Sequence, residues 1–138
     1  MTAELMLDLH ADMADLGKAD EAVTDMAHRM GWSDDVLFQL RLVLEEIMMN
    51  VISHGSGDGR LARVVVNLRQ DGGVLRLELS DDGIAFDPLS LPPPDLSLDI
   101  EDRPIGGLGV HLIRTMMDSV SYRREGDWNR LLVTKSLG

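Results

Sequence analysis

The spacing of apolar residues changes once in the first part of the chain. Leucines alternate with other residues at Leu5, Leu7 and Leu9, which predicts a short, half-buried strand. From Leu16 onward the apolar residues instead recur every three or four positions, the rhythm of an amphipathic helix. We therefore expect a helix over Asp12–Met30 that Gly31 closes.

A second helix and a β-hairpin follow. Ser33 suits the N-cap of a helix that keeps the same rhythm and ends at Gly55 and Gly57. Two alternating runs then flank the turn Asp71–Gly73, and this pattern predicts a hairpin. The apolar stripe of the helix is Leu37, Leu40, Leu44, Ile47 and Val51, and the two hairpin runs are Val64, Val66, Leu68 and Leu75, Leu77, Leu79.

The remaining chain begins with a segment that does not suit a packed element. The prolines concentrate in Asp81–Pro104 together with several acidic residues, which predicts a solvated loop. A loop longer than about 15 residues in a compact domain is usually functional or disordered. Three glycines then open a third helix with Leu112, Ile113, Met116 and Met117 as its apolar stripe. Two strands around 120–124 and 131–137 end the chain, joined by a turn at 125–129.

The order of these elements predicts an α+β fold. Strands that are connected by hairpins run antiparallel, and the helices must bury their apolar stripes against one face of the sheet. We expect a two-layer α/β sandwich with a mainly antiparallel sheet. At 138 residues, with 44% hydrophobic and 27% charged residues, the chain suits a single folded domain over residues 1–138.

The charge balance narrows the kinds of ligand. The chain has 24 acidic and 13 basic residues and a net charge of −11, which disfavours nucleic acids and anionic membrane surfaces. A polyphosphate would need a local site of backbone amides, a helix N-terminus or a bound cation. Without cysteine there is no disulfide or thiol chemistry, and no apolar run approaches the roughly 20 residues of a membrane span. We expect a cytoplasmic protein.

Glu46 and Asn50 are the first candidates for chemistry. Four residues at about 100° each leave their side chains only about 40° apart around the helix, one turn above the other. A carboxylate there can accept a proton while the carboxamide offers an oxygen to Mg²⁺. The same spacing also fits two polar residues on a solvated face. Glu45 points about 100° away and is interpreted as a surface charge.

Asp81, Asp82 and Gly83 follow directly after a predicted strand. A carboxylate at Asp81 could accept a hydrogen bond from the exocyclic amine of a purine, and Gly83 would let the backbone approach the ring. The alternative is an ordinary Asp-Gly turn.

Gly106, Gly107 and Gly109 open the third helix. Glycines before a helix let backbone N–H groups surround an anionic oxygen, and the helix terminus adds a favourable partial charge. The segment lacks the lysine and hydroxyl residue of a P-loop, and no βαβ unit surrounds it.

In combination and in this order, the three signals resemble the GHKL ATPase superfamily with its Bergerat nucleotide-binding fold. The resemblance is greatest to the anti-sigma factor serine/threonine kinases of bacterial partner-switching systems. EEIMMNVISHG resembles the N box of that family, DDGIAFDP its first glycine box, and GGLGVHLIRTMMDSVSYRREGDWNRLL its second glycine box and final hairpin. The match covers roughly residues 37–137.

The resemblance implies a role for individual residues. Glu46 takes the place of the general base and Asn50 that of the Mg²⁺ ligand. Asp81, with Gly83, takes the place of the adenine contact. The phosphate-cradling turn corresponds to Gly107, Leu108 and Gly109, and the ATP lid to the loop at about 89–106.

Two positions depart from the family pattern. Ala85 stands where the first glycine box often has a second glycine. Asn129 and Arg130 stand where relatives often have paired threonines near the nucleotide. The adenine side of the site is therefore where this chain differs most.

The resemblance implies an ATP- and Mg²⁺-dependent protein serine kinase that also binds a regulator. Its substrate would be a serine of a STAS-domain anti-anti-sigma protein, and its sequestered partner a sigma factor or another regulator. A homodimer is a further expectation. The alternative is a non-catalytic switch module that binds nucleotide or partner without transferring phosphate. The catalytic part of a histidine kinase is a weaker alternative, because no phosphoacceptor helical hairpin precedes the motifs.

Overall fold

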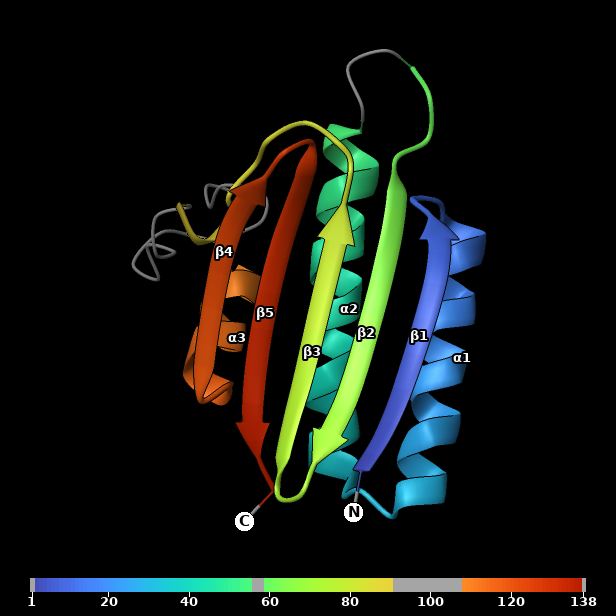
Figure 1. Ribbon diagram of the computed structural model, residues 1–138, viewed down its shortest axis with the longest axis vertical. Coiled ribbons are helices and arrows are strands. Elements are labelled where there is room, and N and C mark those ends of the chain that lie inside the picture. Colours follow the sequence, from blue (N-terminus) through green and yellow to red (C-terminus); the bar gives the residue numbers. More distant parts are fainter. Residues whose placement is uncertain (1, 56–58, 91–107, 138) are drawn as a thin grey trace, which may run out of the picture.

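The computed structural model describes residues 2–55, 59–90 and 108–137, which form a sheet with helices packed against it (Figure 1). A short 3-10 turn, η1, lies at Pro88–Ser90. The helices are α1 (Met13–Met30), α2 (Asp34–His54) and α3 (Leu108–Met116). The strands are β1 (Thr2–His10), β2 (Arg63–Asp71), β3 (Val74–Asp81), β4 (Ser119–Glu125) and β5 (Trp128–Ser136).

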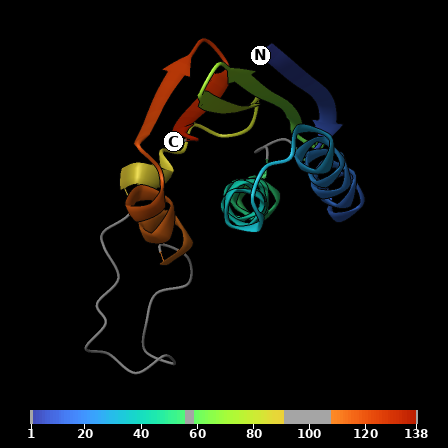
Figure 2. The ribbon, with the colours of Figure 1, turned by 90° about the horizontal axis from the view of Figure 1, so that it is seen from below.

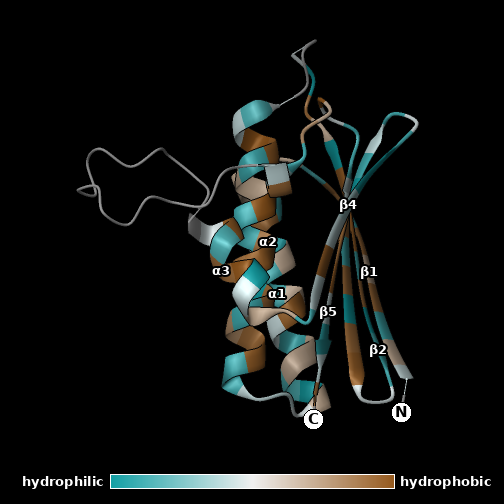
Figure 3. Cartoon of the chain, turned by 90° about the vertical axis from the view of Figure 1, so that its left-hand side faces the viewer, coloured by the Kyte–Doolittle hydropathy of each residue, from teal (hydrophilic) through white to brown (hydrophobic). Residues whose placement is uncertain are grey.

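The sheet is antiparallel throughout and has the order β1-β2-β3-β5-β4. The last strand of the chain therefore lies between β3 and β4, and its register places Asn129 opposite Asp81. The helices cover one face of the sheet, with α2 between α1 and α3 (Figure 2), and no helix of the described residues lies on the other face (Figure 3). The predicted two-layer α+β sandwich is confirmed.

Local capping explains where the first two helices begin and end. The Asp12 carboxylate accepts a hydrogen bond from the Asp15 N–H at 2.8 Å, and the Ser33 hydroxyl accepts one from Val36 at 3.2 Å. α1 ends at Gly31, whose φ of 71° is the left-handed conformation that glycine adopts most readily. α2 ends at Gly55, whose N–H donates to Val51 O. Both helices agree with the sequence prediction, except that Asp12 is the cap of α1 and not its first residue.

The later elements require corrections. The sequence pattern predicts Asp81 at the start of a solvated loop, but Asp81 is the last residue of β3 and only 8% exposed, and Pro88 is buried in η1. The same pattern predicts Leu112 in the apolar stripe of α3, but Leu112 is 41% exposed. The buried positions are Val110 and Ile113 on the helix and Met117 just beyond it, because α3 turns this face toward α2 and the sheet. Residues 91–104 of the expected loop lie outside the described residues.

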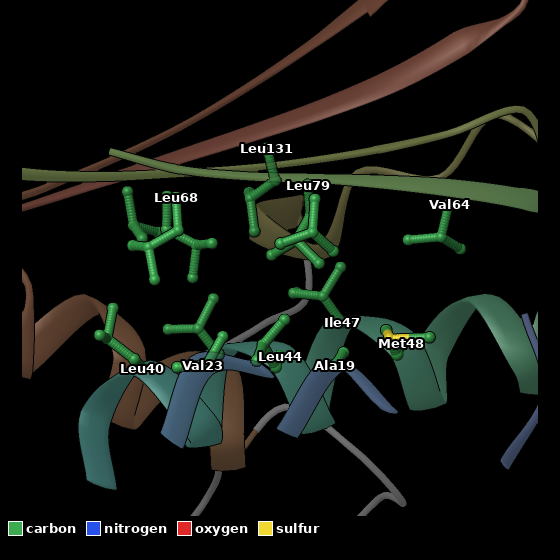
Figure 4. Close-up of a cluster of buried hydrophobic side chains, with 14 of the residues drawn as sticks. Ala19, Val23, Leu40, Leu44, Ile47, Met48, Val64, Leu68, Leu79 and Leu131 are labelled. Carbon is green, nitrogen blue, oxygen red and sulfur yellow. The ribbon is translucent and has the colours of Figure 1, made fainter. Parts of the chain in front are cut away.

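α2 holds the two layers together. Its side chains Leu40, Leu44, Ile47 and Met48 extend toward Leu68, Leu79 and Leu131 of the sheet, while Ala19 and Val23 of α1 close one flank (Figure 4). All of these side chains are buried. Because α2 is packed on its sheet side and on both flanks, the positions of its polar residues relative to β3 and α3 are set by the core. Of the helices described, none is long and apolar enough to cross a membrane.

Candidate functional site

A pocket lies where the second half of α2 passes the ends of β3 and β5. About 410 Å³ of empty space lies within it when the open solvent at its mouth is included. Three carboxylate or carboxamide side chains line it: Asn50 from α2, Asp81 from β3 and Asn129 from β5. Its apolar walls include Ile47, Val51, Leu79, Ile84 and Leu131. A slot with apolar walls and a few polar groups suits a flat, partly polar ring system.

Asp81 is the buried acidic group of this pocket. Its Oδ1 accepts hydrogen bonds from Asn129 Nδ2 at 2.9 Å and from the Gly83 N–H at 3.1 Å. Burial raises the pKa of the carboxyl above its ordinary value, while these two hydrogen bonds and the nearby Arg124 oppose that rise. Within the described residues Oδ2 has no hydrogen-bond donor, so one oxygen of the carboxylate is available to a ligand.

Gly83 lies too close to its neighbours to carry a side chain without a shift. A Cβ at this position would be 3.1 Å from both Asp81 Oδ1 and the carbonyl oxygen of Gly55. The segment after β3 thus passes directly over the C-terminus of α2, where the Ile84 N–H donates to Gly55 O at 3.4 Å. The close approach of the backbone favours glycine at this position. The bond from the Gly83 N–H to the Asp81 side chain, two residues earlier, is that of an Asx turn. The approach of Gly83 to a purine ring stays a prediction.

Asn50 enters the same pocket from the last turns of α2. Its Nδ2 is buried and has no hydrogen-bond partner among the described residues. A buried amide nitrogen without an acceptor is costly unless a ligand supplies one. Rotation of the amide by 180° exchanges its nitrogen and oxygen, so the group can present either a donor or an acceptor.

Glu46 lies one helical turn before Asn50, outside the lining of the pocket. Burial raises the pKa of its carboxyl, and the negative charge of Glu45 raises it further. A carboxylate with a raised pKa is a better proton acceptor at neutral pH than an exposed one. Glu45 itself is nearly half exposed and pairs with Arg41 at 3.6 Å, which agrees with its interpretation as a surface charge.

Gly109, at the start of α3, packs directly on Glu46. A Cβ on Gly109 would overlap with Cδ, Cγ and Oε1 of Glu46, so only glycine leaves room for the glutamate side chain as it stands. Gly109 of the predicted phosphate turn therefore contacts Glu46, the predicted base, although 63 positions separate the two residues in the sequence.

The predicted site residues thus gather in two adjacent places. Asn50 and Asp81 share the pocket, with Gly83 bonded to Asp81. Glu46 lies beside them against Gly109. Leu108 is the first residue of α3. Gly107 and residues 91–106 of the expected lid lie outside the described residues.

Sequence reasoning missed several residues of the pocket. The Tyr122 hydroxyl donates to Asn129 Oδ1 at 2.5 Å, and the rings of His54 and Phe86 lie 4.4 Å apart at the pocket wall. The sequence did hold one signal, since Asn129 and Arg130 stand where relatives often have paired threonines. That signal indicated this region, but it did not show which of the two residues faces the pocket. Asn129 faces the pocket, whereas Arg130, the next residue of the strand, bonds to Ser80 Oγ at 2.9 Å and meets Glu78 and Glu125.

Comparisons with known proteins agree with this geometry. Residues 9–135 match the model of the histidine kinase-like ATPase domain. The chain is 35% identical over 109 residues to the serine/threonine-protein kinase BtrW of Bordetella bronchiseptica, covering 79% of this chain and 77% of that protein. It is 30% identical over 116 residues to the serine-protein kinase RsbW of Bacillus cereus, covering 80% and 70%.

A solved structure shares the fold. The crystal structure of the RsbU and RsbW domains of a Mycobacterium tuberculosis protein superposes with a TM-score of 0.69 at 13% identity. The superposition covers 97% of this chain and 32% of that one. At this identity the likeness concerns the fold alone.

Proposed function

The chain belongs to the histidine kinase-like ATPase domain family and is a serine/threonine-protein kinase, and we propose on that basis which residues carry the reaction and which protein receives the phosphate. The proposed reaction is transfer of the γ-phosphoryl group of ATP to a serine of a STAS-domain anti-anti-sigma protein. The observation that carries this assignment is the meeting of Glu46, Asn50, Asp81 and Gly109 around one end of α2.

The adenine of ATP would occupy the pocket. The apolar walls suit the two faces of a purine, and Asp81 Oδ2 is the acceptor that the exocyclic amine requires. A guanine would place a carbonyl oxygen against the same carboxylate, and two acceptors repel. Asp81 therefore supports adenine over guanine.

The residues present fit a magnesium ion at Asn50. Its amide nitrogen is buried and has no partner among the described residues, and after rotation of the amide its oxygen is the kind of ligand that Mg²⁺ takes together with phosphate oxygens and water. The described residues include no group of three or more His, Asp or Glu side chains that could hold a metal on their own, so the nucleotide would supply most of the ligands. When bound, Mg²⁺ offsets part of the phosphate charge that a protein with a net charge of −11 would otherwise repel.

Glu46 would act on the substrate serine. The serine oxygen forms a bond to the γ-phosphorus while the bond to the β–γ bridging oxygen breaks, and ADP leaves with that electron pair. The Glu46 carboxylate orients the hydroxyl and takes its proton. Gly109 allows Glu46 to lie directly beside the N-terminal end of α3, where backbone N–H groups favour phosphate oxygens.

The partners follow from the family resemblance. The phosphorylated protein would be a STAS-domain anti-anti-sigma protein, and the partner held in its place a sigma factor or another regulator. A homodimer and a cytoplasmic location belong to the same proposal. The negative charge argues against a nucleic-acid partner.

The proposal is tested with radiolabelled ATP. The purified protein is incubated with Mg²⁺, γ-labelled ATP and a STAS-domain anti-anti-sigma protein from the same genome, and we expect label on a serine of that protein. Glu46→Ala should keep ATP binding and lose about 10²- to 10⁴-fold in transfer rate, the usual effect of removing a general base. Asn50→Ala should lose binding of Mg²⁺-ATP.

The outcomes separate the assignments. Full kinase activity in Glu46→Ala would reject the role of Glu46. A tight complex with the STAS-domain protein that never carries label would instead favour the non-catalytic switch module. Absence of any Mg²⁺-ATP binding by calorimetry at millimolar nucleotide would reject the nucleotide site as a whole.

A further inference from the structure

Asn129 is the most completely bonded polar side chain of the pocket. It is 5% exposed and lies at the start of β5, opposite Asp81. Its Nδ2 donates to Asp81 Oδ1 at 2.9 Å and to the Ile84 carbonyl oxygen at 2.9 Å. Its Oδ1 accepts from the Phe86 N–H at 3.3 Å and from the Tyr122 hydroxyl.

These bonds leave one orientation for the amide. The Phe86 N–H can only donate, so the atom facing it must be the oxygen of Asn129. The nitrogen must then face Asp81 and Ile84. The Ile84 carbonyl oxygen is an acceptor, and so is each oxygen of the ionised Asp81 carboxylate, so both require a donor from Asn129. All the hydrogen-bonding capacity of the side chain is used within the protein, so Asn129 has none left for a ligand.

The arrangement has a consequence for Asp81. Asn129 and the Gly83 N–H both occupy Oδ1, so only Oδ2 is available to a base in the pocket. The same amide ties the 84–86 segment, which continues into η1, to the end of the sheet. One side chain thus bonds both the acceptor carboxylate and the backbone that forms part of the pocket wall.

We propose that Asn129 is a positioning residue of the nucleotide site, which orients the Asp81 carboxylate toward the adenine amine and couples it to the 84–86 segment. This inference rests on the proposed ATP site. Asn129 acts through Asp81 and does not touch the base.

The charges around Asp81 make Asn129 important for its ionisation. Burial favours the protonated acid, and the bond from Asn129 is the largest single effect that opposes it, followed by the bond from Gly83 and the charge of Arg124. Asp82 adds a like charge that favours protonation. Tyr122 and His54 face the pocket from β4 and α2. Since a protonated Asp81 offers the adenine amine a poorer acceptor, loss of Asn129 should weaken ATP binding most at low pH.

The test measures the affinity for Mg²⁺-ATP between pH 5.5 and 8.5 by calorimetry. The proteins are the wild type, Asn129→Ala and the control Asn67→Ala. Asn67 is an asparagine of β2 on the exposed face of the sheet, away from the pocket. Affinities are expressed relative to the wild type at each pH, so that titration of the nucleotide itself cancels.

We expect Asn129→Ala to lose affinity for Mg²⁺-ATP progressively as the pH falls. The acid limb, which is the loss of affinity on the acid side of the pH profile, should begin about one pH unit higher than in the wild type, because the removed hydrogen bond stabilised the ionised carboxylate. Asn67→Ala should match the wild type at every pH. A uniform loss of affinity for Asn129→Ala with no shift of the acid limb would overturn the inference and leave Asn129 a packing residue.

A measurement on the wild type tests the same inference if Asn129→Ala does not fold. The carboxyl carbon of Asp81 and the side-chain amide of Asn129 are followed by NMR as the pH is lowered, and both should titrate with one midpoint. An Asn129 amide that stays constant while Asp81 titrates would overturn the inference. If Asp81→Asn leaves Mg²⁺-ATP binding intact, or the wild type binds none at any pH, the proposed site is wrong. A wild type that binds and an Asp81→Asn that does not, with no shift in Asn129→Ala, would reject only the role of Asn129.

Discussion

Gly109→Ala should separate the activity of this kinase from its stability. The added methyl carbon would lie less than 3.0 Å from three atoms of Glu46, whereas carbon atoms in contact sit about 3.5–4.0 Å apart. The overlap includes Cγ as well as the carboxyl end, so the whole Glu46 side chain must turn away from α3. The displacement required at the carboxylate is more than about 1 Å, which is enough to lower a rate about 100-fold when it misplaces a catalytic group.

The stability of the same variant should change little or fall slightly. Alanine favours a helix over glycine by about 0.5–1 kcal/mol, and this gain offsets part of the cost of turning Glu46 out of its place. We therefore expect Gly109→Ala to fold, to bind Mg²⁺-ATP through the pocket at Asp81, and to transfer phosphate at least about 100-fold more slowly than the wild type.

Gly17→Ala is the matched control. Gly17 is also a helical glycine, in α1, but a Cβ there meets nothing within 4 Å. This variant should gain about 0.5–1 kcal/mol of stability and keep wild-type activity. The measurements are single-turnover transfer of labelled phosphate, calorimetry with Mg²⁺-ATP and urea unfolding. If Gly109→Ala transferred phosphate at the wild-type rate, the contact between Gly109 and Glu46 would have no part in catalysis.

Two further predictions concern titrating carboxyl groups. Burial, and then a hydrogen bond shared with Glu45, raises the pKa of Asp20 to about 6, so this group makes the protein less stable above that pH and the penalty disappears as the pH falls toward 4. Asp20→Asn should thus stabilise the protein by about 1 kcal/mol at pH 8, after allowance for solvent screening and for the lost ion pair with Arg41. In urea unfolding this gain should fade below pH 5. An equal gain at pH 8 and below pH 5 would show that the ionisation of Asp20 is not its cause. The rate of phosphoryl transfer should fall as the pH drops through the pKa of Glu46, which is raised above the usual 4.5. Glu45→Gln removes a like charge, so it should move this fall in rate to lower pH. A pH-rate profile that Glu45→Gln leaves unchanged would show that Glu45 does not act on Glu46.

Much of the fold was readable from local patterns. The cap at Ser33, the glycine at Gly31 and the hairpin around Gly72 act within a few residues of themselves, so their signals are complete in a short stretch of sequence. The helix stripes and strand alternation are equally local, because they report which side of one element is apolar. The same patterns did not predict that Leu112 is exposed, since that depends on how α3 is turned against α2.

The sequence by itself determined the elements, the two-layer class and, through the family resemblance, the candidate residues Glu46, Asn50 and Asp81. Only the tertiary structure decided that β5 lies beside β3, that Asn129 bonds Asp81 across 48 positions, and that Gly109 leaves room for Glu46. The physical reason is the distance along the sequence over which each contact acts. Patterns of three or four residues encode contacts along one element, whereas the site is made of contacts between elements that the packing of one shared core brings together.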